Sequence, residues 1–427
     1  MHLQTLTLTN YRGAKALTLA LDSQLNVFVG ANGAGKSTVL DAATILLSWA
    51  VNRIMTPGAS GRPIAESDIT NGKDSSIVEL TGRHNNKDIT WRLAKARKGT
   101  RPSDRPTTHL KPLTQYTEQI QSQLSDEAAA LPLFVYYPVN RAVFEIPLRT
   151  RSQSNFEIFA AYNKALTSDT DFRSFFEWFR AREDLENELK ILGMEGATLK
   201  AQKVQEEPDP QLEAVRSAIH QLLPEFTNIR VRRSPLRMEI EKNGQLLTVN
   251  QLSDGEKCLI AMVSDLARRL AIANPSAENP LAGEGIVLID EIDLHLHPKW
   301  QRIVVPRLLK IFPNCQFLVS THSPHVLTHV KPNNIFLLRW EAENITAGKP
   351  AQSYGQTANR ILEDLMGLET TRPRSISSEL HSVYEMIDRN HLDEARAEIA
   401  SIRQKMGEDP DLIKADVLIR RKELINR

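Results

Sequence analysis

Cysteine, aromatic residues and net charge are all scarce in this chain of 427 residues. Its two cysteines, Cys258 and Cys315, stand far apart, which excludes a disulfide framework and a four-cysteine metal site and suits a reducing compartment. No run of 18 apolar residues occurs, so we expect no membrane-spanning helix. The first residues also lack the charged and apolar regions of a secretory leader. We therefore expect a cytoplasmic protein without membrane contact.

The small net charge, +1, is the sum of segments of opposite sign. Residues 92–111 hold seven Lys or Arg and one Asp, and prolines interrupt them, so we expect a basic loop. This loop is either solvated or a contact for nucleic acid or an acidic protein. Residues 183–213 hold nine Asp or Glu and three Lys, which predicts an acidic helical arm or loop. Near-neutrality therefore does not exclude contact with nucleic acid.

Hydrophobic patterning predicts an α/β fold with two helical stretches. A hairpin and a buried strand are expected within 3–29, and further strands at 76–82, 88–94, 133–137, 228–233, 236–249, 286–289, 316–320 and 335–338. Asn243-Gly244 within one of these segments favours a type I′ hairpin turn. Helices are expected at 36–50, 114–130, 255–273 and 298–312, over most of 155–225 and through the last 50 residues.

A phosphate-binding loop is the strongest motif. Gly30 to Ser37, GANGAGKS, matches G-x-x-x-x-G-K-[ST] in full, with a predicted strand before it and a helix after it. Its glycines let backbone N–H groups face phosphate oxygens at a helix N-terminus. Lys36 is expected to reach the β- and γ-phosphates of ATP, and Ser37 to bind Mg²⁺. The candidate ATP-binding residues of this motif are Asn32, Gly33, Ala34, Gly35, Lys36, Ser37 and Thr38.

Two carboxylates follow the predicted strand 286–289. Asp290 at the end of that strand is expected to hold Mg²⁺ together with Ser37. Glu291 faces differently and can polarise the attacking water, which makes it the candidate catalytic carboxylate. Adjacent acids after four aliphatic residues are poor core residues, because burying them unpaired is costly.

Three further segments resemble motifs of the ATP-binding-cassette superfamily in its SMC-like form. Residues 252–257, LSDGEK, contain a capping box and resemble the signature, which in that family closes over the γ-phosphate held by the other subunit. The resemblance implies this contact for Ser253, Asp254, Gly255 and Glu256. Residues 320–323, STHS, place His322 where the family has its catalytic switch histidine. Residues 10–12, NYR, resemble an N-terminal motif whose arginine, here Arg12, approaches the nucleotide.

Other positions near these motifs stay open. Residues 293–298, DLHLHP, occupy the D-loop position. Within them, His295 and His297 have metal-pair spacing, but no third ligand is evident. The Q-loop glutamine is either Gln115 or lies around Asn140-Arg141.

The resemblance implies an ABC-type P-loop ATPase head with a mixed, mainly parallel sheet, an inserted helical arm and a C-terminal helical tail. The expected parts are an N-terminal lobe at 1–145, the arm at 146–227, a C-terminal lobe at 228–342 and a partner-binding region at 343–427. The arm lacks sustained heptads, so it is shorter than an SMC coiled coil.

Residues 290–301, DEIDLHLHPKWQ, and a tail without a nuclease acid cluster resemble PtuA-like ATPases of Septu and retron anti-phage systems. The resemblance implies an ATP-dependent homodimer or higher oligomer that performs no nuclease chemistry itself. Its partners would be a PtuB-like HNH nuclease and, in a retron, a reverse transcriptase with its msDNA and ncRNA. The tail at 375–427 is the candidate nuclease-docking region. Candidate nucleic-acid or partner contacts are Arg97, Lys98, Arg101, Arg232 and Arg233, with Arg230 and Arg237 beside the last two.

Two other functions compete with this hypothesis. An SMC-like DNA repair or recombination ATPase acting on DNA ends is one, although the short arm and the missing Cys-x-x-Cys hook count against it. The other is a transporter ATPase. The inserted arm and the Ser-Asp-Gly-Glu form of the signature count against it.

Overall fold

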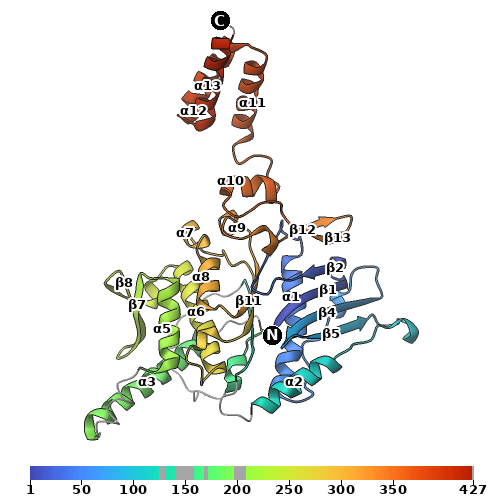
Figure 1. Cartoon of the computed structure of the whole chain (residues 1–427), viewed down its shortest axis with the longest axis vertical. Coiled ribbons are helices and arrows are strands. Elements are labelled where there is room, and N and C mark those ends of the chain that lie inside the picture. Colours follow the sequence, from blue (N-terminus) through green and yellow to red (C-terminus); the bar gives the residue numbers. More distant parts are fainter. Residues whose placement is uncertain (125–129, 140–157, 168–171, 197–207, 426–427) are drawn as a thin grey trace. The chain divides into compact units, whose positions relative to one another are not determined.

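The computed structural model describes residues 1–124, 130–139, 158–167, 172–196 and 208–425 (Figure 1). Two compact units divide the chain, Met1–Gln356 and Thr357–Arg427. Asn140 and Arg141 lie outside the described residues. Over the described residues, no helix is long and apolar enough to cross a membrane.

An antiparallel sheet and two helices form the N-terminal part of the first unit. The sheet order is β2-β1-β4-β5, with β1 His2–Tyr11, β2 Ala14–Ala20, β4 Ser75–His84 and β5 Lys87–Ala96. The helices are α1 Lys36–Met55 and α2 Lys111–Gln123. Trp91 of β5 is fully buried, and its indole N–H donates to the Leu46 carbonyl of α1 (3.2 Å), which joins sheet and helix. The predicted hairpin is confirmed, whereas the predicted basic loop begins only after β5.

The central sheet has six strands in the order β13-β12-β3-β11-β10-β6. Their bounds are β3 Leu25–Val29, β6 Leu133–Tyr137, β10 Gly285–Ile289, β11 Cys315–Ser320, β12 Ile335–Glu341 and β13 Asn344–Gly348. All neighbours are parallel except β12 and β13. Every residue of β3, β10 and β11 is buried, as their continuous apolar runs predict. The carboxyl ends of these strands therefore meet at one edge of the sheet.

A third sheet and several helices complete the first unit. The sheet order is β7-β8-β9, with β7 Phe226–Arg233, β8 Leu236–Lys242 and β9 Gln245–Thr248. The helices are α3 Phe172–Gly196, α5 Pro210–Leu222, α6 Asp254–Ala273, α7 Pro298–Gln301, α8 Val304–Ile311 and α9 Pro324–Leu327. In Figure 1, β7 and β8 lie on one side of β11, and β1, β4 and β5 on the other. Asn243 and Gly244 have φ of +50° and +81°, as a type I′ turn requires.

The second unit is a three-helix bundle that follows a short helical segment. Its elements are α10 Ala358–Arg360, a π-helical turn Ile361–Leu365, α11 Arg374–Asp388, α12 Leu392–Met406 and α13 Pro410–Ile425. The bundle has its own core: Leu380, Val383, Ile387, Ala395, Ile399, Ile402, Leu412, Ala415 and Ile419. The helical region expected from residue 343 thus starts later, because 344–348 form β13 in the central sheet.

Candidate functional site

The phosphate loop joins β3 to α1 in the predicted strand–loop–helix arrangement. Gly33 and Gly35 have φ of +79° and +101°, which side chains other than glycine's rarely adopt. Gly30 is needed for space, because a Cβ there would overlap the Leu338 carbonyl. The Lys36 ammonium lies over its own loop and donates to the carbonyls of Gly30 (2.9 Å) and Ala31 (3.0 Å).

Asp290 and Glu291 lie at the carboxyl end of β10, two strands away from β3. Asp290 is 3% exposed, and its N–H donates to the Tyr137 carbonyl of β6 (2.9 Å). The Ser320 hydroxyl donates to the Asp290 carboxylate and accepts from the Glu291 N–H (2.8 Å). Burial lowers the pKa of Lys36, while the charges of Asp290 and Glu291 raise it. The lysine of the phosphate loop and both carboxylates therefore share one electrostatic site.

The turn after β11 is tied to the turn after Glu291. The Asp293 carboxylate accepts from the Thr321 hydroxyl (2.5 Å) and from the His322 N–H (3.3 Å). These bonds place the backbone of His322 at the same sheet edge as the two carboxylates. Sequence reasoning quoted these segments but gave no role to Ser320 or Asp293. The available signal was a hydroxyl at the last residue of β11 and a carboxylate in the turn after β10.

The donor set fits a nucleotide with its magnesium ion. Ser37 is exposed on the first turn of α1, and Asp290 offers a carboxylate beside Lys36. Mg²⁺ prefers hard oxygen ligands and is usually shared between one or two side chains and phosphates. Loop N–H groups and Lys36 supply the charge that a triphosphate needs. Bound Mg²⁺ would neutralise charge between the phosphates, while Glu291 is placed to orient water.

Arg12 lies at the turn between β1 and β2, where it has a φ of +49°. Its guanidinium donates to Asp41 of α1 (2.6 Å) and to Asp68 (2.9 Å). The side chain is 36% exposed, so it is held in place without being buried. This arrangement fixes a cation beside the helix that begins at the phosphate loop. Its expected approach to the nucleotide stays a prediction.

The signature segment caps α6. The Ser253 hydroxyl and N–H both donate to the Glu256 carboxylate (2.9 and 2.8 Å), which forms the predicted capping box. Lys242 of β8 forms an ion pair with the same carboxylate. Burial alone would raise the pKa of Glu256, but Lys242 and Ser253 outweigh it and lower this pKa.

A cavity of about 640 Å³ opens beside the signature. A Cβ on Gly255 would overlap the His295 carbonyl, so the signature packs tightly against the D-loop. The cavity is lined by Glu225, Ser253, Asp254, Gly255, His295, Leu296, His297, Lys299 and Trp300. His297 caps α7 by accepting from the Lys299 N–H (3.2 Å). Across the described residues, no group of three His, Cys, Asp or Glu side chains could hold a metal ion.

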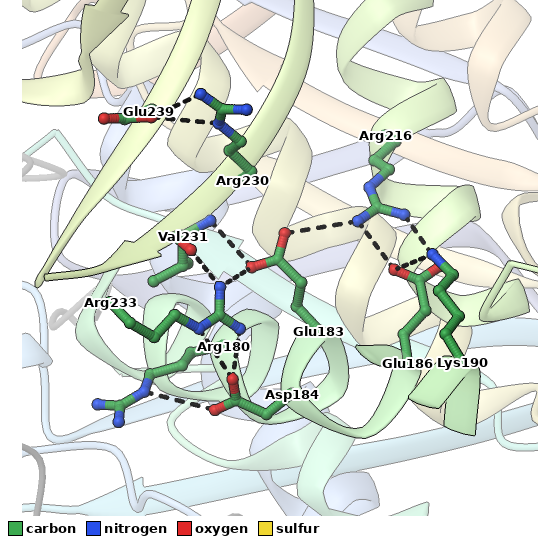
Figure 2. A network of polar contacts seen from close by, with 10 residues as sticks. All are labelled: Arg180, Glu183, Asp184, Glu186, Lys190, Arg216, Arg230, Val231, Arg233 and Glu239. Atoms are coloured by element: carbon green, nitrogen blue, oxygen red, sulfur yellow. Dashed lines mark hydrogen bonds and ion pairs between the residues drawn. The ribbon is translucent and has the colours of Figure 1, made fainter. Parts of the chain in front are cut away.

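Arg97 and Arg233, two of the five candidate contact cations, are held to other elements of the chain by their side chains. Arg97 donates to the carbonyls of Lys73 (2.8 Å) and Ile69 (3.1 Å) and so holds a neighbouring loop. Arg233 forms ion pairs with Glu183 and Asp184 of α3 (Figure 2). These intrachain partners compete with any external ligand, and the contact role of Arg97 and Arg233 stays a prediction.

The other three candidates are exposed. Lys98 and Arg101 lie in the loop after β5. Arg232 is 51% exposed, although it is 3.6 Å from the nearly buried Glu239. Arg230 and Arg237 bind that same carboxylate (3.0 and 2.7 Å), so three guanidiniums surround one acid.

The acidic segment 183–213 is partly neutralised where it is described. Glu183 and Glu186 are buried on α3, and Arg216 of α5 bridges them (3.6 and 3.3 Å; Figure 2). Arg182 likewise pairs with Asp209 (2.7 Å). Charges that are segregated in the sequence are therefore mixed in the fold.

Of the two locations left open for the Q-loop, the structure describes that of Gln115. Gln115 is exposed on α2, whose other face packs Leu113, Tyr116 and Ile120. The alternative around Asn140 and Arg141 falls outside the described residues.

This fold and site define an α/β P-loop ATPase. Residues 25–328 match the family model described as "AAA domain, putative AbiEii toxin, Type IV TA system". The chain is 31% identical to "Retron Ec83 probable ATPase" of Escherichia coli, over 95% of this chain and 84% of that protein. It is 30% identical to "Retron Vc95 probable ATPase" of Vibrio cholerae serotype O1 biovar El Tor, over 79% of this chain and 73% of that protein. The chain belongs to this family of retron ATPases.

Similarity to other proteins is more local or more distant. "Septu protein PtuA" of Bacillus thuringiensis is 34% identical over 30% of this chain and 34% of that protein. Among solved structures, "SMC head domain from Thermotoga maritima" aligns over 82% of this chain and 99% of that one, with 14% identity and a TM-score of 0.45.

Proposed function

We propose that this protein is the ATP-driven switch subunit of a bacterial anti-phage complex of Septu or retron type. In this proposal it binds ATP and Mg²⁺ between two copies of the chain and controls a PtuB-like HNH nuclease. The observation that carries the proposal is the convergence of Lys36, Asp290 and Glu291 at one sheet edge in a chain whose relatives are named retron ATPases and Septu PtuA.

Dimerisation is supported by the position of the signature. Among the described residues, Ser253 donates to Glu256, Glu256 forms an ion pair with Lys242, and Gly255 packs against the His295 carbonyl. These contacts fix the cap of α6, and a helix N-terminus suits an anion. A second copy would offer its triphosphate to that end of α6.

The test is trapping of a nucleotide-bound dimer. Glu291→Gln keeps the shape of the side chain but removes the charge that polarises water, so ATP should accumulate unhydrolysed between two copies. Light scattering after gel filtration should show an ATP-dependent doubling of mass. Glu343→Gln, at a carboxylate whose side chain is 86% exposed, is the control. An unchanged mass for Glu291→Gln with bound ATP would refute the dimer mechanism.

Docking of the nuclease is assigned to α13. Leu412, Ala415 and Ile419 face the bundle core, yet Ile413, Val417 and Leu424 are 53%, 57% and 72% exposed. A helix that is apolar on two faces is normally covered on both. The three exposed positions should therefore take an apolar surface of the HNH subunit. Triple substitution of Ile413, Val417 and Leu424 by Ser should abolish co-purification of that subunit and leave the melting temperature nearly unchanged.

Nucleic acid contact is assigned to the exposed cations Lys98, Arg101 and Arg232. Such contacts are electrostatic, so each lost cation should lower the salt dependence of binding. Reversal of Lys98 and Arg101 to Glu should weaken binding of the retron msDNA–reverse transcriptase partner. If the charge-reversed variant binds this partner as tightly as the wild type at every salt concentration, these residues do not contact nucleic acid. Binding of free DNA ends in preference to this partner would instead support the DNA-repair alternative.

A further inference from the structure

The β12–β13 hairpin lies directly against the phosphate loop. A Cβ on Gly35 would overlap the Ile345 side chain, and one on Gly30 would overlap the Leu338 carbonyl. Ile345 also donates its N–H to the carbonyl of Gly13 (3.1 Å), in the turn that carries Arg12. The hairpin, the β1–β2 turn and the phosphate loop therefore form one packed group.

Trp340 is the exposed aromatic residue of this hairpin. It is the direct cross-strand partner of Ile345 in the antiparallel pair. A Cβ on Gly13 would overlap its ring, so the indole is pressed against the backbone of the β1–β2 turn. Trp340 is nevertheless 55% exposed. One side of a large aromatic ring is thus fixed, while the remainder is open to solvent next to the phosphate loop.

The strand order gives the direction in which a nucleotide must run. On one side of β3 are β11 and then β10, whose ends hold His322, Asp290 and Glu291. The phosphate that is cleaved must lie on that side, near the carboxylates. On the other side of β3 are β12 and β13. The sugar and base, at the opposite end of the nucleotide, therefore extend toward the hairpin and Trp340.

We propose that Trp340 is the platform on which the base of the bound nucleotide stacks. The proposal rests on ATP binding by the phosphate loop, as stated under the proposed function. Aromatic side chains stack on any base, since every base has a π-face. The ring therefore contributes affinity for the nucleoside part of ATP and none for the phosphates.

The test compares ATP with inorganic tripolyphosphate, which keeps the phosphates and lacks the base. By calorimetry with Mg²⁺, Trp340→Ala should bind ATP about 5- to 150-fold more weakly, the range that base stacking represents. Affinity for tripolyphosphate should stay within about twofold. Trp340→Phe should recover most of the ATP affinity. Tyr354→Ala, at an aromatic residue that is 64% exposed and outside the hairpin, should bind both ligands as the wild type does.

Each other outcome overturns the inference. Unchanged ATP affinity in Trp340→Ala would mean that the base lies elsewhere. Equal loss of ATP and tripolyphosphate would mean that Trp340 only supports the loop through Ile345. In both cases Lys36→Ala should still lose both ligands, which keeps the proposed ATP-binding function separate. Failure of the wild type to bind ATP would overturn the inference and that function together.

Discussion

A buried ion cluster ties the signature helix to the central sheet, and its removal should be costly. Asp265 of α6 accepts from Arg268 (2.7 Å), from Arg269 (2.6 Å) and from the Tyr137 hydroxyl (3.0 Å). Asp265→Asn would leave two buried guanidiniums without a counter-charge. Breaking a buried ion pair from one side costs about 3–5 kcal/mol. At about 2–3 °C per kcal/mol, we expect the melting temperature of the first unit to fall by about 6–15 °C.

The pH dependence adds an independent check on Asp265. Burial alone would raise the pKa of Asp265, but Arg269 and Arg268 outweigh it and lower the pKa to about 2 from 3.8. Because the pKa of Asp265 is lower in the folded than in the unfolded protein, its ionisation stabilises the fold above about pH 4. This stabilisation is lost as the pH falls toward 2. The difference in melting temperature between the wild type and Asp265→Asn should therefore become smaller in this acid range.

Thermal unfolding followed by circular dichroism from pH 3 to pH 7 measures both effects of Asp265. Asp88→Asn is the matched control, because Asp88 pairs with Arg83 (2.7 Å) while both side chains are more than 40% exposed. Exposed pairs contribute little to stability. If Asp265→Asn melts no lower than Asp88→Asn at pH 7, the buried cluster does not stabilise the fold and the reasoning fails.

Three further predictions concern the site and the arm. Gly30→Ala should weaken ATP binding at least about fivefold, because overpacking against the Leu338 carbonyl costs about 1–3 kcal/mol. Gly348→Ala, with open space around it, should leave ATP binding unchanged. Ser320→Ala should lower the kcat of ATP hydrolysis at least about tenfold and leave Mg²⁺-free ATP binding intact, because the Ser320 hydroxyl positions the Asp290 carboxylate. An unchanged kcat would contradict this positioning role. Glu183→Gln should speed hydrogen exchange at the N–H of Val231, which donates to Glu183 (3.0 Å), and should lower the free energy of unfolding by about 1.5–3 kcal/mol. Glu188→Gln is the control, and equal exchange rates at Val231 in the two variants would contradict this prediction.

The central sheet and the phosphate loop could be predicted from the sequence because their signals are local. Unbroken apolar runs indicate strands buried on both faces, and the loop motif needs fixed residue types at fixed spacing. The short strand β13, NITAG, has neither a long apolar run nor an alternating pattern, so it was missed. It forms because β12 is buried beside β3 and offers it a free edge.

One helix boundary was missed although its signal is present. The expected helix 298–312 is divided into α7 and α8. Pro306 falls in the first turn of α8, where a missing N–H is tolerated, and it would break a continuous helix. A proline inside an amphipathic run was therefore the sign of a second helix start.

The partners of charged residues could not be predicted, because they are distant in sequence. Arg233 and Glu183 are 50 positions apart, and Arg97 reaches a carbonyl 24 positions away. A list of cations therefore overestimates those available to nucleic acid. Only the fold distinguishes Lys98 and Arg101, which are exposed, from arginines that hold the protein together.

The position of the boundary between the two units has a consequence for how such proteins diversify. The last strand of the central sheet ends at Gly348, and the second unit, with its separate core, begins at Thr357. An exchange of genetic material at this junction would replace the whole helical bundle without removing any strand, phosphate-loop residue or carboxylate of the ATPase. The same ATPase fold could thus acquire a different helical bundle through a single recombination event, with little cost to its own folding.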